Sequence, residues 1–330
     1  MTLIVARVEN GCLSIAADTM LTEHGMSLPI REGVLKSVCL NSGTCVSFSG
    51  SPELAMASIR EFRTSFPLGA NFATTISFFE NSSNNTANDY IVAFASPAKI
   101  VTIRDGSRTH SSAKTHWIGD KNAYERFREI EHQQRRRHEH GQAISAVLFA
   151  DENSGSPASS LYSAMRNVVL DSDVPSVGGF VTVLSNRGSG FRFSVYSDIL
   201  LDWPLEFDEH RTLQPTDPID LSATGQNAGY SVSQISSGYC NLNVVAFYLL
   251  KGQILFVFHE MDDNGKSSGC WENIEPNQIA DTLDSALDLP FRAMCLVISA
   301  PDGIQPSRPR ENSNDGVGLC FQCEVNTMSR

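Results

Sequence analysis

The sequence lacks any long hydrophobic run, because none of its apolar stretches approaches the ~20 residues that a membrane-spanning helix requires. Its first residues also lack the basic start and the apolar stretch of a secretory signal peptide, so we expect the chain to stay in the cytoplasm, with no membrane partner. Basic residues are scarce, with 25 Lys and Arg against 37 Asp and Glu. The resulting net charge of -12 argues against nucleic acid as the main partner.

Paired metal-binding cysteines are missing too. The eight cysteines are scattered along the chain, and several lie inside apolar stretches, which indicates buried thiols in a reducing compartment. Cys320 and Cys323 form the only Cys-x-x-Cys pair, whereas a structural zinc site needs about four ligands. We therefore interpret this pair as two ordinary thiols, and we expect no metal and no cofactor.

Common catalytic and phosphate-binding motifs are absent as well. There is no Gly-x-Ser-x-Gly elbow, no Gly-x-x-x-x-Gly-Lys-Ser loop and no His-Glu-x-x-His pair. The glycines near Arg187 lie between two β-prone runs and predict a hairpin loop. The pair His259 and Glu260 has no nucleophile beside it in the sequence. These absences exclude the usual serine hydrolase, nucleotide-binding and zinc peptidase interpretations.

What remains is the composition of a globular protein, with 41% hydrophobic and 19% charged residues in a chain of 330 residues.

The second residue of the chain is the first indication of its chemistry. Removal of Met1, which is normally trimmed before a residue as small as threonine, would give Thr2 a free α-amine. That amine titrates near ~8 and can take the hydroxyl proton, directly or through a water. Taken alone, Thr2 is more simply an ordinary strand residue, so the following residues decide.

An Asn-Gly pair predicts a hairpin directly after Thr2. Asn10 and Gly11 lie between the apolar, β-prone runs 3–8 and 13–17, and both residues tolerate the positive φ of a tight turn. A hairpin brings the end of its second strand back beside the start of its first. We therefore expect Asp18 to lie close to Thr2.

Lys36 is a cation within an otherwise apolar stretch that we predict to be a strand. A lysine half buried beside a carboxylate can keep its charge and lower the pKa of a neighbouring hydroxyl or amine.

Gly50 follows the next predicted strand, where Ser51 and Pro52 begin a helix. Glycine lets a ligand approach the backbone, and amides at a helix entrance suit a developing oxyanion. Each signal is weak alone, since a lysine or aspartate is also an ordinary polar strand end.

In this order, the residues resemble the N-terminal-nucleophile hydrolases, specifically the proteasome β-subunits and their bacterial relatives. The matching segments are Thr2, Asn10-Gly11, Ala16 to Thr19, Lys36 and Ser47 to Gly50. The resemblance implies that Thr2 is the nucleophile and that Asp18 and Lys36 support it. It also implies that Gly50 donates its amide to the oxyanion hole.

The resemblance extends to about residue 196, with one departure. Asp173 and Ser176 match the Asp-x-x-Ser of the family, although Val177 is inserted before the two glycines that follow. The resemblance implies that both residues support the amine and hydroxyl of the nucleophile. Asp120 and Lys121 stand where the family has a serine and a glycine, which leaves one supporting hydroxyl without a match.

The resemblance further implies an α+β fold, a four-layer αββα sandwich of two mainly antiparallel sheets between helix layers. The implied activity is that of a threonine-type hydrolase cleaving amide bonds, most naturally in peptides. A homo-oligomer in the form of a ring, with an unfoldase or another protein partner, is implied as well. Two alternatives stay open: a non-catalytic subunit of such a ring, and a small-molecule amidase of the same fold.

The rest of the chain predicts an extension to this core. We expect the core over residues 2–200, with helices from Pro52, over 123–138 and over 158–170. We interpret the His- and Arg-rich end of the second helix as a solvated helix end. The extension over 201–299 contains a strong hairpin signal at 242–260, and residues 300–330 read as a disordered tail. The extension either completes the sandwich, caps a chamber or binds a partner.

Overall fold

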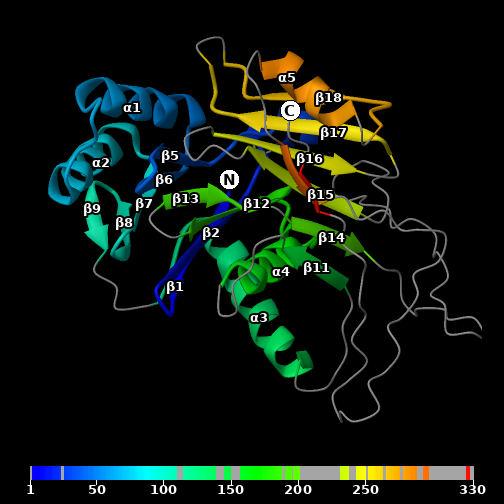
Figure 1. Ribbon diagram of the computed structural model, residues 1–330. Coiled ribbons are helices and arrows are strands. Elements are labelled where there is room, and N and C mark those ends of the chain that lie inside the picture. Colours follow the sequence, from blue (N-terminus) through cyan, green and yellow to red (C-terminus); the bar gives the residue numbers. More distant parts are fainter. Residues whose placement is uncertain are drawn as a thin grey trace, which may run out of the picture.

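The computed structural model is a mixed α/β structure built on antiparallel sheets (Figure 1). It describes residues 2–23, 26–109, 114–138, 145–149, 157–187, 190–194, 196–200, 231–237, 243–249, 252–262, 265–275, 278–287, 293–296 and 325–327. Among these residues, no helix is both long enough and apolar enough to cross a membrane. Most of the predicted tail, with Cys320 and Cys323, lies outside the described residues.

The first sheet starts with the predicted hairpin. Its strand order is β10-β1-β2-β12-β13, with bounds Thr115–Gly119, Leu3–Glu9, Cys12–Asp18, Val181–Arg187 and Gly190–Phe193. Asn10 and Gly11 take φ of 51° and 78°, as the turn requires, and Ile4 lies opposite Ala17. The hairpin prediction is therefore confirmed, and its register brings Asp18 to the start of β1.

The second sheet is a meander of consecutive strands. Its members are β5 (Ser37–Asn41), β6 (Thr44–Ser49), β7 (Asp89–Ala95), β8 (Ala98–Arg104) and β9 (Ser107–Thr109). The prediction that Lys36 lies inside a strand is wrong by one residue, because β5 begins at Ser37. The Phe48 amide nevertheless donates to the Lys36 carbonyl at 3.1 Å, so Lys36 is still held against β6.

Helices cover the outer face of each of these two sheets (Figure 1). On the second sheet lie α1 (Pro52–Ser65), which Ser51 caps as predicted, and α2 (Phe72–Thr86), which the sequence did not reveal. On the first sheet lie α3 (Lys121–His138) and α4 (Ala158–Val169). The α3 helix begins two residues before the predicted start, because the carboxylate of Asp120 caps it.

The inner faces of the two sheets share one apolar core. Alternate residues of the second sheet face opposite ways, as the pleat of a strand requires. Val46 and Val92 pack under α1 and α2, whereas Cys45 and Ile91 belong to the same buried cluster as Val5 of the first sheet. This contact fixes how the two sheets meet, and the candidate site lies at their junction.

A third sheet contains strands from both sides of residue 200. Its order is β11-β14-β15-β16-β17-β18, with bounds Ser145–Phe149, Tyr196–Leu200, Ser231–Ser237, Val244–Leu249, Ile254–His259 and Ser268–Trp271. Its further members are β19 (Ala293–Leu296), which pairs with β15, and β20 (Val325–Thr327), which pairs with β19. The hairpin predicted over 242–260 is confirmed as β16 and β17. The remaining short elements are β3 (Thr22–Glu23), β4 (Met26–Ser27), η1 (Ile30–Glu32) and α5 (Ile279–Leu287).

Aromatic packing joins the third sheet to the core. The ring of Phe180, just before β12, stacks on Phe247 of β16 with centroids 4.4 Å apart and planes 7° apart. Phe256 of β17 lies 5.1 Å from the same ring, and all three residues belong to the large core cluster of the first sheet. Strands β16 and β17 are therefore packed into the main core.

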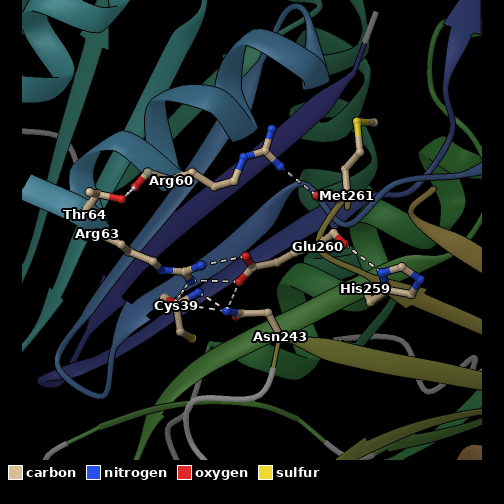
Figure 2. Close-up of polar contacts among 8 residues, drawn as sticks. All are labelled: Cys39, Arg60, Arg63, Thr64, Asn243, His259, Glu260 and Met261. Atoms are coloured by element: carbon tan, nitrogen blue, oxygen red, sulfur yellow. Dashed lines mark hydrogen bonds and ion pairs between the residues drawn. The ribbon is translucent and has the colours of Figure 1, made fainter. Parts of the chain in front are cut away.

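Polar contacts reinforce this attachment on the side of α1 (Figure 2). Arg63 makes a two-pronged ion pair with Glu260, at 2.6 and 2.8 Å, and also donates to the Cys39 carbonyl at 2.8 Å. The Asn243 side chain accepts from the Cys39 amide at 2.7 Å and donates to its carbonyl at 3.0 Å. Arg60 donates to the Met261 carbonyl at 3.1 Å. Helix α1 and strand β5 thus hold both β16 and β17.

Candidate active site

Three of the predicted residues meet in one buried cluster. Lys36 Nζ lies 2.6 Å from Thr2 Oγ1 and 2.8 Å from Asp18 Oδ2. Thr2 Oγ1 donates to Asp18 Oδ1, which also accepts from the Leu3 amide at 3.0 Å. The hydroxyl is therefore held between a cation and an anion.

The two sheets supply different members of this cluster. Thr2 directly precedes β1 and Asp18 ends β2, so the hairpin of the first sheet places both. Lys36 comes from the chain just before the second sheet, and it reaches across to donate to the Met20 carbonyl at 2.6 Å as well. Its ammonium thus has three acceptors, which is the number of hydrogens it carries.

Burial sets the electrostatics of the cluster. Thr2 and Lys36 are each 4% exposed, and Asp18 is fully buried. This burial lowers the pKa of the Lys36 ammonium below its ordinary value, while the charge and hydrogen bond of Asp18 work in the opposite direction. An ammonium with a lowered pKa donates more strongly, so Lys36 is suited to stabilise negative charge that develops on Thr2 Oγ1.

A cavity of about 310 Å³ opens onto the cluster and is lined in part by Thr2, Lys36, Ser49 and Gly50. Gly50 takes φ of +119°, and a Cβ at this position would lie 2.0 Å from Asn88 Oδ1. Only glycine fits there, which explains the residue type beside a prospective ligand.

Asn88 fixes the backbone next to Gly50, and no sequence pattern marks this role. Its side chain accepts from the Ser51 amide at 2.8 Å and donates to the Ser51 carbonyl at 3.0 Å. Asn88 directly precedes β7, so its side-chain amide ties the start of β7 to Ser51, the residue before α1. The backbone of the cavity wall is therefore held in place next to Gly50.

The backbone of Thr2 is held by the end of β10. The Asp120 amide donates to the Thr2 carbonyl at 2.7 Å. Gly119 takes φ of +101°, and a Cβ at this position would lie 2.0 Å from the same carbonyl oxygen. The first sheet thus approaches Thr2 so closely that a side chain at position 119 would displace it.

Asp120 joins Ser176 to this region. Burial works to raise the pKa of the Asp120 carboxyl, but hydrogen bonds from Ser176 and from the amides of Ala123 and Asn122 outweigh it and hold that pKa below its usual value. Asp120 is therefore negatively charged at neutral pH, next to Thr2. Its carboxylate binds the start of α3 and Ser176, while its backbone amide binds the Thr2 carbonyl.

Asp173, by contrast, lies apart from the cluster. Its side chain is exposed, its amide donates to Asp171 Oδ1 at 3.0 Å, and no described contact joins its carboxylate to Thr2, Asp18 or Lys36. Its assigned role stays a prediction. Within the described ranges, no group of three or more His, Cys, Asp and Glu side chains is placed to hold a metal ion.

Comparisons with known proteins leave the family open. No family model matches the sequence, and no curated protein matches it. Among solved structures, the crystal structure of eukaryotic HslV from Trypanosoma brucei is similar to this chain at 13% sequence identity and a TM-score of 0.41. The similarity covers 56% of this chain and 98% of the HslV chain. Likeness at this level identifies neither the family of the chain nor its activity.

The close approach at position 119 yields a stability prediction. We expect Gly119→Ala to lower the free energy of unfolding by more than about 1 kcal/mol, because the new Cβ combines a strained positive φ with a clash against the Thr2 carbonyl. Denaturant unfolding measures this change. Gly43→Ala is the matched control, since its Cβ would meet only Asn41 Oδ1 at 3.6 Å. Equal stability of the two variants would contradict the described packing.

Proposed function

We propose that this protein is a threonine-type N-terminal-nucleophile hydrolase that cleaves amide bonds of peptides through Thr2 after removal of Met1. The observation that carries the proposal is the 2.6 Å contact between Lys36 Nζ and Thr2 Oγ1, with Asp18 bonded to both groups. A weak hydroxyl nucleophile needs such a neighbour to lower its pKa and a base to take its proton. Lys36 supplies the first, and the free amine of Thr2 supplies the second.

The proposed reaction has two halves. In the first, Thr2 Oγ1 attacks the substrate carbonyl carbon while the Thr2 amine takes the hydroxyl proton. The carbonyl oxygen becomes an oxyanion, to which the backbone amides around Gly50 donate. The amine then returns the proton to the leaving nitrogen, the C–N bond breaks, and the acyl group stays on Thr2 as an ester. In the second half, water gives a proton to the amine and attacks the ester carbonyl. The amine then returns this proton to Thr2 Oγ1 as the ester C–O bond breaks, which releases the acid and regenerates Thr2.

Lys36 and Asp18 have distinct tasks in this reaction. Lys36 keeps its charge through Asp18 and stabilises Thr2 Oγ1 as the proton leaves. Asp18 accepts from the hydroxyl and from the Leu3 amide, so it fixes the direction of the Thr2 side chain. Ser176 acts through Asp120, and Asp173 keeps only the role that the sequence resemblance implies.

The architecture also supports the proposed activity. We infer the four-layer αββα sandwich from the helices on the outer faces of the first two sheets and from their shared inner core. The cytoplasmic location, the homo-oligomeric ring and a partner such as an unfoldase remain proposals that rest on the resemblance.

A non-catalytic ring subunit is the main rival, and the buried ion pair speaks against it. Desolvating an ammonium and a carboxylate costs several kcal/mol per ion, and well-packed apolar residues in their place are often equally stable or more stable. A scaffold subunit would gain as much from apolar residues at positions 18 and 36. Because both ions bind the Thr2 hydroxyl, the pair favours a catalytic subunit over a scaffold.

Replacement of the nucleophile tests the proposal. We expect Thr2→Ala to lower turnover of a fluorogenic peptide library by about 10³-fold or more, because the attacking oxygen is gone. Thr2→Ser is the matched control, since it keeps both the hydroxyl and the amine and should retain activity. Size-exclusion chromatography should show the same assembly for both variants. Turnover by Thr2→Ala at the parental rate would show that the mechanism is wrong.

The charge of Asp120 predicts a pH effect. A carboxylate near an amine favours the protonated amine, whereas the proposed reaction needs it unprotonated. We therefore expect Asp120→Asn to move the acidic limb of the kcat/KM profile to lower pH. Asparagine caps a helix about as well as aspartate, so α3 should be unaffected. An unchanged limb, or one moved to higher pH, would refute a direct influence of Asp120 on the Thr2 amine.

A further inference from the structure

A second, larger cavity adjoins the one at Thr2. Its volume is about 880 Å³, and Leu21 lines both cavities. One wall is the segment that contains Leu28, Arg31 and Glu32, and the other is residues 265–272 of the C-terminal extension. We call this cavity the extension groove. Both volumes lie in the range of about 300–1,000 Å³ that is typical of ligand sites.

We propose that the extension groove binds an extended segment of the polypeptide whose amide bond is cleaved at Thr2. The proposal rests on the proposed function and assigns the substrate class as polypeptides that are long enough to span both cavities. The shared Leu21 carries the argument for one continuous substrate, because it places the two cavities side by side.

The walls of the groove are held at a fixed distance by hydrogen bonds between them. Ser267 Oγ donates to the Gly33 carbonyl at 3.0 Å, and Ser268 Oγ donates to the Arg31 carbonyl at 2.6 Å. The next residue along the chain, Val34, donates its amide to the Thr19 carbonyl at 2.8 Å. The extension therefore holds the segment that leads to Lys36, and the groove and the catalytic cluster form one connected unit.

The groove has a surface that suits an extended peptide. Its far wall, β18, pairs with β17 on one side and is the last strand of the third sheet in the part of the chain that the structure describes. Edge strands offer backbone groups to which an extended peptide can add, whatever its sequence.

Its side chains favour a peptide of mixed sequence over a ligand of one charge. Cations and anions both line the groove, namely Arg31 and Lys266 against Glu32 and Glu272. Trp271 adds an aromatic face.

The indole of Trp271 takes the space that a side chain at Gly269 would fill. A Cβ on Gly269 would lie 2.4 Å from Cη2 of the indole, so the ring lies against the bare backbone of β18. The same ring packs on the small apolar cluster of β16, β17 and α5. A flat ring held in this way offers area to a peptide side chain at little cost in conformational entropy.

Peptide length tests the groove. We would compare a two-residue fluorogenic amide with two extensions of it by six residues, one on the amino side and one, as a quenched peptide, on the carboxyl side. We expect at least one extension to raise kcat/KM roughly tenfold in the native chain. Trp271→Ala should remove most of that gain and leave kcat/KM of the short amide within about twofold.

Because Trp271 is partly buried, a second variant is needed. Cys270→Arg changes an exposed residue of the groove wall and should also abolish the gain from length without loss of folding. Leu68→Ala, at a fully exposed position outside the groove, is the control. If a folded Cys270→Arg protein treats short and long peptides as the native chain does, the groove is not a substrate site.

Direct binding separates this inference from the proposed function. An eight-residue peptide of the extended series would be titrated into Thr2→Ala while tryptophan fluorescence is recorded. Saturable binding that Cys270→Arg abolishes supports the groove even if the native chain cleaves nothing, in which case only the proposed function fails. If the native chain cleaves peptides but neither peptide length nor either groove variant changes kcat/KM, the groove is not a substrate site. The proposed function is then unaffected.

Discussion

The buried pair of Lys36 and Asp18 is the constraint on which the site depends. An ammonium that is 4% exposed needs acceptors for its hydrogens, and here they are Asp18, the Met20 carbonyl and Thr2 Oγ1. All three acceptors belong to the hairpin of the first sheet or to the residues directly before and after it, whereas Lys36 leads into the second sheet. The two sheets can satisfy the lysine only if they meet at Thr2, so their shared apolar core and the candidate site are one arrangement.

The C-terminal strands extend this arrangement. Phe180 precedes β12 of the first sheet and stacks on β16, while Arg63 of α1 binds Glu260 after β17. The first contact fixes the third sheet against the first sheet, and the second fixes it against α1. An addition to the core thereby becomes part of the surface around Thr2, which is what the proposed long substrate requires.

Local signals in the sequence predict the hairpin, the α1 cap and the pairing of β16 with β17, because turn residues and alternation act over a few positions. Helix α2 escaped prediction because Thr75, Ser82 and Ser83 share its buried face with Ile76 and Phe79, so its apolar stripe is short. The meeting of Lys36 with Thr2 depends on sheet packing, which spacing along the chain does not encode. Asn88 and Asp120 act through the backbone of distant segments, and no pattern marks such a role. A resemblance to known proteins supplied the order of the site residues, and the geometry then showed which of them meet.

The most direct test of the central claim is to map where an acyl group attaches. The purified chain would be allowed to react with a slowly hydrolysed, threonine-directed acylating peptide, and intact mass and fragment spectra would be recorded. The account predicts a chain that has lost Met1 and carries one acyl group on Thr2, with no adduct on the Lys36→Met protein, where the hydroxyl has lost its activating ammonium. An active chain that retains Met1, or an adduct on any other residue, would contradict it.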